Sequence, residues 1–182
     1  MRNSKVVKLR ILAALLLASA CARTPPPVTP IDVFRDTAAQ IASQTNVTAD
    51  RMAGDWIIRQ RFAAAPVGPT GLLTIRTLPN NALQASMTIG SCIQRVCSVS
   101  ERLVLLGPSG PGRWRAVDPP AFWPKGELWV MWMEFDSRTA AIGTPSGEFG
   151  WIMDKQAQGG GDRIAAARDI MDWFGYNIAQ LQ

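Results

Sequence analysis

Residues 127–154 read ELWVMWMEFDSRTAAIGTPSGEFGWIMD, and this stretch decides the fold. It contains three apolar runs, at 127–135, 138–143 and 147–154, and the last two meet at Thr144-Pro145-Ser146-Gly147, a segment of turn-forming residues. Apolar runs of this length bounded by turn residues are typical of β-strands. The stretch therefore predicts three consecutive strands joined by short turns.

The same pattern continues toward the N-terminus as far as residue 54. Turns rich in Pro, Gly and Asn separate five further runs, which predict strands at 54–64, 71–78, 82–91, 96–106 and 112–117. Eight strands joined by short connections favour an all-β domain built as an antiparallel up-and-down barrel. A β-sandwich is the structural alternative.

After residue 154 the apolar period changes from that of a strand to that of a helix. Asp162 is a candidate N-cap, Gly175 a candidate helix end, and the pattern predicts one C-terminal helix over 163–174. The apolar positions on its single stripe are Ile164, Ala167, Met171 and Phe174. We expect this face to pack on the outer wall of the barrel, with a short last strand over 176–181.

The first 20 residues have the three parts of a secretory signal. Basic residues come first, then an apolar stretch from Ile11 to Ala18, which is too short to span a membrane, and then small residues. Leu17-Ala18-Ser19-Ala20-Cys21 resembles a bacterial lipobox, which implies that Cys21 is acylated and becomes the first residue of the mature chain. A plain secreted protein cut near Ala20 is the alternative.

The lipobox resemblance also implies a cellular location. Ala22, rather than Asp, follows Cys21, and by similarity to Gram-negative sorting this predicts a lipid anchor in the outer membrane. Residues 21–32 are rich in Pro and predict an extended tether. Residues 33–46 predict an amphipathic helix that packs on the domain, and 47–182 form the barrel domain with its helix.

Composition excludes several classes of chemistry. The chain has 182 residues, no His and three Cys, so a Ser-His-Asp triad, a Cys-His pair and a His-ligated zinc site are excluded. The carboxylates are scattered, without a pair spaced for acid–base work. The net charge of +5 falls to +1 without residues 1–20, which argues against a nucleic-acid partner. We therefore expect a protein that is not an enzyme and that binds no metal and no cofactor.

Two cysteines remain besides Cys21. Cys92 and Cys97 flank four residues at the tip of a predicted hairpin. In an exported protein such a pair predicts a disulfide, because a short spacer allows the two strands to approach across the turn. A redox-active pair is the alternative, although the spacing is not Cys-x-x-Cys.

Three segments resemble the signatures of the lipocalin family. Residues 50–62, DRMAGDWIIRQRF, resemble the first signature with its Gly-x-Trp. Residues 134–143, EFDSRTAAIG, resemble the signature at the turn between the sixth and seventh strands. Residues 149–155, FGWIMDK, resemble the eighth strand and the basic residue of the third signature, which is usually Arg. With Gly175-Tyr176, the resemblance is to the bacterial outer-membrane lipoprotein branch, and it implies an eight-stranded lipocalin barrel.

The resemblance also implies roles for individual residues. A closed end is expected from Gly54, Trp56, Glu134 and Lys155, because in the family this tryptophan plugs the barrel and the basic residue packs across it. Two-residue alternation from Trp56 and Lys155, with similarity for the sixth and seventh strands, predicts the inner wall. The predicted ligand-binding residues are Ile58, Gln60, Phe62, Leu128, Val130, Trp132, Thr139, Ala141, Phe149, Trp151 and Met153. Trp129, Met131 and Met133 are then expected to face outward.

An inner wall of this kind is aromatic and aliphatic. It favours a small lipophilic ligand such as a fatty acid or a lysophospholipid, unless the same residues fill a solid core. The alternative function is surface binding of another protein, an envelope-assembly partner or a hydrolase, because Trp129 and Met131 make the outer face of one strand apolar. The sequence is also compatible with a dimer.

Overall fold

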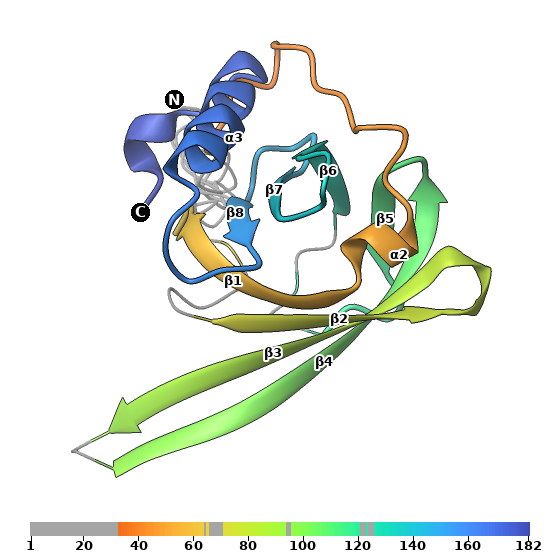
Figure 1. Cartoon of the computed structure of the whole chain (residues 1–182), viewed down its shortest axis with the longest axis vertical. Coiled ribbons are helices and arrows are strands. Elements are labelled where there is room, and N and C mark those ends of the chain that lie inside the picture. The colour runs from red at the N-terminus through yellow and green to blue at the C-terminus, as the bar shows by residue number, and fades with distance from the viewer. Residues whose placement is uncertain (1–32, 64, 66–70, 94–95, 121–122, 124–125) are drawn as a thin grey trace, which may run out of the picture. The chain divides into compact units, whose positions relative to one another are not determined.

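Eight antiparallel strands close into a barrel in the computed structural model (Figure 1). They are β1 (Gly54–Arg61), β2 (Leu72–Leu78), β3 (Ala82–Ile93), β4 (Val96–Gly110), β5 (Arg113–Ala116), β6 (Glu127–Met133), β7 (Thr139–Gly143) and β8 (Gly150–Asp154). Each strand pairs with the next in sequence, and β8 pairs with β1. The predicted up-and-down barrel with one C-terminal helix is therefore confirmed.

The structure describes residues 33–63, 65, 71–93, 96–120, 123 and 126–182, and it describes only the backbone of 89–93 and 96–99. The predicted signal and the whole predicted tether, which begins at Cys21, lie outside these ranges. Among the described residues, no helix has the length and apolar character needed to cross a membrane.

The hairpin of β3 and β4 continues past its neighbours as a two-stranded arm (Figure 1). β2 pairs with β3 only from Ala82 to Met87, whereas β4 stays paired with β3 as far as Ile93 opposite Val96. The register places Cys92 directly opposite Cys97. Their side chains are outside the described part of the chain, so the structure does not show the disulfide, which stays a prediction.

Strand β4 also runs further than predicted, through Pro108 to Gly110. Pro108 pairs with Trp114 of β5, and the register shifts between Pro108 and Gly110. A proline lacks the N–H that a regular ladder needs, and irregularities of this kind are where strands accommodate it.

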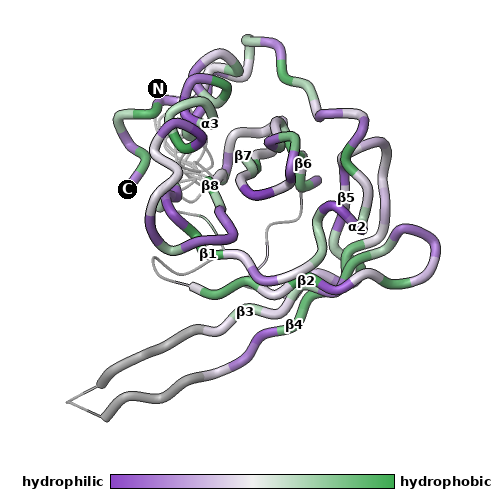
Figure 2. The backbone as a smooth tube through the Cα atoms, viewed as in Figure 1, coloured by the Kyte–Doolittle hydropathy of each residue, from purple (hydrophilic) through white to green (hydrophobic). Residues whose placement is uncertain are grey.

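Apolar side chains form two separate clusters, and Figure 2 shows hydrophobic and hydrophilic residues interleaved along the strands. The interior cluster contains inward-facing side chains of all eight strands, among them Trp56, Ile75, Leu83, Leu106, Trp114, Val130, Ile142 and Trp151. The outer cluster lies between the barrel wall and helix α3 (Gly161–Trp173), and contains Phe34, Phe62, Met131, Ala141, Ile152, Ala167, Met171, Tyr176 and Leu181. The barrel wall is therefore buried on both faces where β6, β7 and β8 meet α3.

Glycines with positive φ lie just outside both ends of helix α3, at positions 160 and 175. Gly160 precedes the helix in the left-handed region, and no described side chain caps the helix at this end. The prediction of Asp162 as the N-cap is therefore wrong, because Asp162 lies in the first turn. Gly175 ends the helix as predicted, with a φ of +84° that favours glycine. The helix is attached to the barrel by Arg163, which forms a salt bridge of 3.1 Å with the buried Asp154.

The predicted helix over 33–46 does not form, and this segment is irregular instead. Its backbone pairs with distant segments: Phe34 N donates to Gly147 O and Asp36 N donates to Gly175 O, each at 2.8 Å. The buried Arg35 side chain donates to three carbonyl oxygens, those of Ala39, Pro145 and Phe174. These tertiary hydrogen bonds replace the ones that a helix would have formed within the segment.

Three short helical turns complete the described chain. α2 (Ala49–Met52) precedes β1, η1 (Pro79–Asn81) joins β2 to β3, and η2 (Ile178–Gln180) lies near the C-terminus. The last strand predicted over 176–181 is therefore wrong. Only an isolated bridge forms there, between Tyr176 and Arg35.

Candidate functional site: the barrel interior and its two ends

Trp56 closes one end of the barrel. Its ring is fully buried, and its Nε1 donates to Met52 O of α2 at 2.7 Å. Lys155 lies across the ring, with Nζ 3.8 Å from the ring centroid, and the same ammonium donates to Ala53 O at 2.6 Å. A cation over an indole face is electrostatically favourable, so both polar atoms and the π-face of this plug have partners.

Gly54 makes the close contact at this end possible. A Cβ at position 54 would lie 2.7 Å from Lys155 Nζ, and the φ of Gly54 is +107°. Glycine adopts this conformation readily, whereas residues with a side chain do not. The Gly-x-Trp spacing therefore has a physical reason here: the glycine admits the lysine that covers the tryptophan.

Burial also affects the charge of Lys155. Desolvation lowers the pKa of the ammonium below its usual value, and the nearby Asp55 opposes this shift. The contacts with Trp56 and Ala53 O are thus made by an ammonium that has lost part of its hydration.

Glu134 lies at the same end, in the turn between β6 and β7. Its carboxylate accepts hydrogen bonds from the backbone N–H groups of Asp136 and Arg138 and forms a salt bridge with the Arg138 side chain. The hydrogen bond from Arg138 is the main cause that lowers the pKa of Glu134. Arg51 of α2 donates to Glu134 O and Phe135 O, at 3.0 and 3.1 Å. Sequence reasoning missed Arg51, which joins α2 to this turn.

Six of the predicted inner-wall residues lie in the interior cluster, each no more than 3% exposed. They are Ile58, Leu128, Val130, Phe149, Trp151 and Met153.

The other five predicted inner-wall residues are on the outer face, so their predicted orientation is wrong. Gln60 accepts a hydrogen bond from Arg168 of α3 at 3.1 Å, and Thr139 donates to Asp154 at 2.5 Å. Phe62, Trp132 and Ala141 belong to the outer cluster or pack against it. Phe62 stacks on both Phe34 and Tyr176, with ring centroids 5.0 and 5.3 Å away.

Register shifts explain the errors on β1 and β6. The pairing of β1 with β8 shifts between Ile58 and Gln60, and that of β6 with β7 shifts between Val130 and Trp132. An extra residue in one strand reverses which face every later side chain occupies. Met133 accordingly joins the interior cluster instead of facing outward, whereas Met131 does face outward and is covered by the outer cluster.

On β7 the predicted inward-facing positions are wrong by one residue. Ala140 and Ile142 pair with Met153 and Trp151 of β8. Directly opposite residues share a face of the sheet, so these two side chains face inward, as their place in the interior cluster shows. Thr139 pairs with Asp154 and faces α3.

The opposite end of the barrel, which we call the mouth, has an aromatic group of three side chains. Phe149 and Trp151 are stacked with ring centroids 5.7 Å apart, and Trp123 meets Trp151 edge-on at 6.5 Å. All three are at most 4% exposed. Sequence reasoning missed Trp123, which lies in the connection between β5 and β6, outside every predicted strand.

Two donors at the mouth have no partner. Trp151 Nε1 and Arg61 Nε are buried and make no hydrogen bond within the described part of the chain. This contrasts with the closed end, where Trp56 Nε1 is bonded. Unpaired buried donors are uncommon in native proteins, and each one calls for an explanation such as an absent ligand or water.

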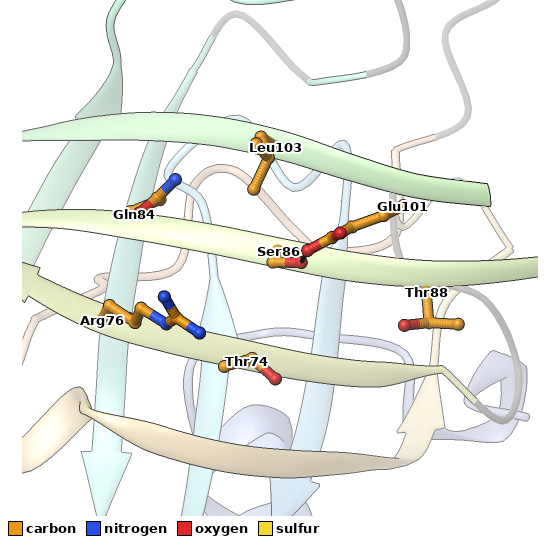
Figure 3. Close-up of a pocket in the computed structure, with 7 residues that line it drawn as sticks. All are labelled: Thr74, Arg76, Gln84, Ser86, Thr88, Glu101 and Leu103. Carbon is orange, nitrogen blue, oxygen red and sulfur yellow. Dashed lines mark hydrogen bonds between the residues drawn. The ribbon is translucent and has the colours of Figure 1, made fainter.

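A groove of about 680 Å³ lies on the outer face of β2, β3 and β4, away from the predicted inner wall (Figure 3). Its lining is mostly polar and consists of Thr74, Arg76, Gln84, Ser86, Thr88, Glu101 and Leu103. Ser86 donates a hydrogen bond to Glu101 across the groove floor. Two further exposed apolar residues, Leu105 and Val117, continue from Leu103 along this side of the barrel.

Comparison with known proteins adds no family. The chain matches no protein-family model, and no curated protein is significantly similar to it.

Proposed function

We propose that this protein is a lipocalin-type barrel, anchored through an acylated Cys21 to the outer membrane of a Gram-negative envelope, that binds or carries a small lipophilic ligand. The observation that supports it most directly is the closed eight-stranded barrel with an apolar interior, plugged at one end by Trp56 and fronted at the other by aromatic rings. A barrel of eight strands has room for its own side chains or for one small ligand.

In this structure the interior side chains occupy the space that a ligand would need. The interior cluster is almost fully buried, so a ligand has to displace some of its members. Met87, Met133 and Met153 belong to this cluster. Methionine is unbranched and flexible, so these side chains can change rotamer at low cost and make room for an acyl chain.

The first experiment asks whether anything binds. We expect lipids to co-purify with the full chain and to be identified by mass spectrometry, and the delipidated chain to bind palmitate saturably in a calorimetric titration. Trp151→Ala should weaken palmitate binding by about 1–3 kcal/mol, the value of one large apolar side chain's contact. Trp173→Ala is the matched control, because Trp173 is 81% exposed on α3. Absence of saturable binding of any acyl compound would rule the carrier function out.

Anchoring is tested separately. Cys21→Ser should leave the protein in the soluble fraction or unprocessed, because the acyl chains supply the affinity for the membrane. Fractionation of cells expressing each form measures this. If Cys21→Ser still fractionates entirely with the outer membrane, the lipoprotein assignment is wrong.

A second candidate function is surface binding of an envelope protein, either an assembly partner or a hydrolase that the barrel inhibits. The outer groove favours it, together with Leu103, Leu105 and Val117, which are 54%, 49% and 53% exposed. Leu103→Ser combined with Leu105→Ser should abolish such binding and leave palmitate titration unchanged. Normal envelope function of that double variant would exclude this candidate.

A further inference from the structure

Arg61 and Trp151 are neighbours across the mouth of the barrel. They are directly paired in the register of β1 and β8. Arg61 N and O are both hydrogen-bonded to Gln182, at 2.8 and 3.0 Å, and therefore point away from β8. The two residues thus form a pair without hydrogen bonds between their backbones, the type of antiparallel pair in which side chains lie closest.

Their side chains share the inner face of the wall. Trp151 belongs to the interior cluster, and directly opposite residues occupy the same face. Phe62, the residue after Arg61, lies in the outer cluster, as alternation requires if Arg61 faces inward. The register shift after Ile58 produces this orientation, so two-residue alternation from Trp56 could not have placed Arg61 inside.

The polar groups of this pair are incompletely satisfied. Arg61 Nη1 donates to Ala63 O at 3.2 Å, but Arg61 Nε and Trp151 Nε1 are buried without partners. No carboxylate forms a salt bridge with Arg61 among the residues that the structure describes. A cation and an indole N–H on the same face of the wall, beside aromatic rings, are the kind of donors that an anionic acceptor needs.

We propose that Arg61 and Trp151 bind the anionic head group of a single-chain amphiphile, a carboxylate or a phosphate, with its acyl chain directed toward the closed end. This proposal rests on the proposed function and specifies the chemical class of the ligand. The tail would follow the apolar interior from Phe149 and Trp151 past Met153 toward Trp56. A neutral ligand without an acceptor would leave both donors unpaired.

The outer groove is a poorer site for the same head group. It contains Arg76, but Glu101 lies in the same lining and repels an anion. Arg76 therefore provides a matched control: it is an arginine on a neighbouring strand, exposed, and outside the interior.

The test is calorimetric titration of the full chain with three ligands of equal chain length: palmitate, 1-palmitoyl lysophosphatidate and methyl palmitate. The wild type should bind one or both anions at least ~10-fold more tightly than the ester, as expected for hydrogen bonds to a charged group. Arg61→Gln should remove most of that preference and change the affinity for methyl palmitate less than about 2-fold. Trp151→Phe, which keeps a ring and removes the N–H, should weaken anion binding a few-fold, by roughly the value of one hydrogen bond. Thermal melts confirm that each variant is folded.

The outcomes separate this proposal from the proposed function. A preference for palmitate over lysophosphatidate, or the reverse, identifies the head group. If the wild type binds methyl palmitate as tightly as the anions, or if Arg61→Gln weakens all three ligands equally, the head-group site is wrong and the carrier function stands. If Arg76→Gln removes the preference instead, the anion binds in the outer groove and the proposal is overturned. If nothing binds to the wild type, both proposals fail.

Discussion

The two ends of this barrel each bury a tryptophan, and they differ in how its N–H is used. At the closed end, Trp56 Nε1 donates to Met52 O, and Lys155 covers the ring. At the mouth, Trp151 Nε1 is equally buried and has no partner among the described residues. A satisfied buried donor contributes to stability, whereas an unsatisfied one costs about 1–3 kcal/mol of desolvation. The donor at the closed end therefore stabilises the fold, whereas the donor at the mouth is unused in this structure, as the proposed head-group site requires.

The largest expected effect is at the closed end. Trp56→Ala removes the plug and leaves Lys155 without its aromatic partner, so it should lower the free energy of unfolding by about 3–5 kcal/mol. Urea denaturation measures this, and Trp173→Ala on the exposed face of α3 is the control, with an expected change within ~0.5 kcal/mol. Equal midpoints for the two variants would contradict a structural role for the closed end.

A second effect concerns the rim of the mouth, which is held from outside by Tyr176. Its hydroxyl accepts from Thr144 N at 2.8 Å and lies 3.0 Å from Phe149 O, to which it can donate. Burial raises the pKa of Tyr176 from 10.0 to about 12. Because the folded-state pKa is the higher one, this contribution is complete below pH 10 and is lost as the pH rises from 10 toward 12.

We therefore expect the wild type to lose about 2–3 kcal/mol of stability over that range relative to Tyr176→Phe, since each pKa unit is worth 1.36 kcal/mol. Denaturation at several pH values measures the difference. The chain has a single tyrosine, so its absorbance titration reports the pKa directly. A tyrosinate that forms near pH 10 in the folded protein would contradict the buried, hydrogen-bonded hydroxyl.

The two ends can be compared most directly by replacing the tryptophan at each end with phenylalanine. Trp56→Phe loses the hydrogen bond to Met52 O and weakens the cation–π contact, so it should cost about 1–3 kcal/mol. Trp151→Phe also loses packing, but it removes an unpaired donor, so we expect a net cost below ~1 kcal/mol. Urea denaturation in the absence of lipid measures both. If Trp151→Phe is the more destabilising of the two, Trp151 Nε1 has a partner in solution and the contrast between the ends disappears.

The smallest effect is expected at the surface of the closed end. Arg138 pairs with Glu134 in the β6–β7 turn, and its side chain is 47% exposed. Water and salt screen an exposed ion pair, so Arg138→Gln should change the stability less than any substitution of a buried residue described above. A thermal melt at low and high salt checks it. A loss of stability as large as that of Trp56→Phe would show that this turn determines the barrel's stability.

Much of the fold could be predicted from the sequence because it depends on local signals. The eight strands lie between Pro, Gly and Asn turns, and each was found within a few residues of its predicted bounds. Gly175 marks the helix end because few other residues adopt its positive φ. The contact of Trp56 with Lys155 was also expected, from a resemblance whose physical content is that Gly54 leaves room for the lysine.

Orientation along the strands could not be predicted in the same way. The register shifts after Ile58 and Val130 each insert a residue, and hydropathy carries no signal for them. Gln60 and Trp132 consequently face outward, and Arg61 faces the interior. The candidate head-group site therefore exists only because one strand departs from strict alternation.

The sequence by itself determined the number of strands and their order, since both follow from residues close together in the chain, whereas the plug of Trp56 and Lys155 was expected only from the resemblance. Tertiary structure alone decided the course of residues 33–48, because Arg35 and its backbone neighbours bond to segments more than one hundred residues away. It also decided which side chains meet at the mouth. Arg61 and Trp151 lie 90 positions apart, and only the pairing of β1 with β8, which closes the barrel, brings their donors together.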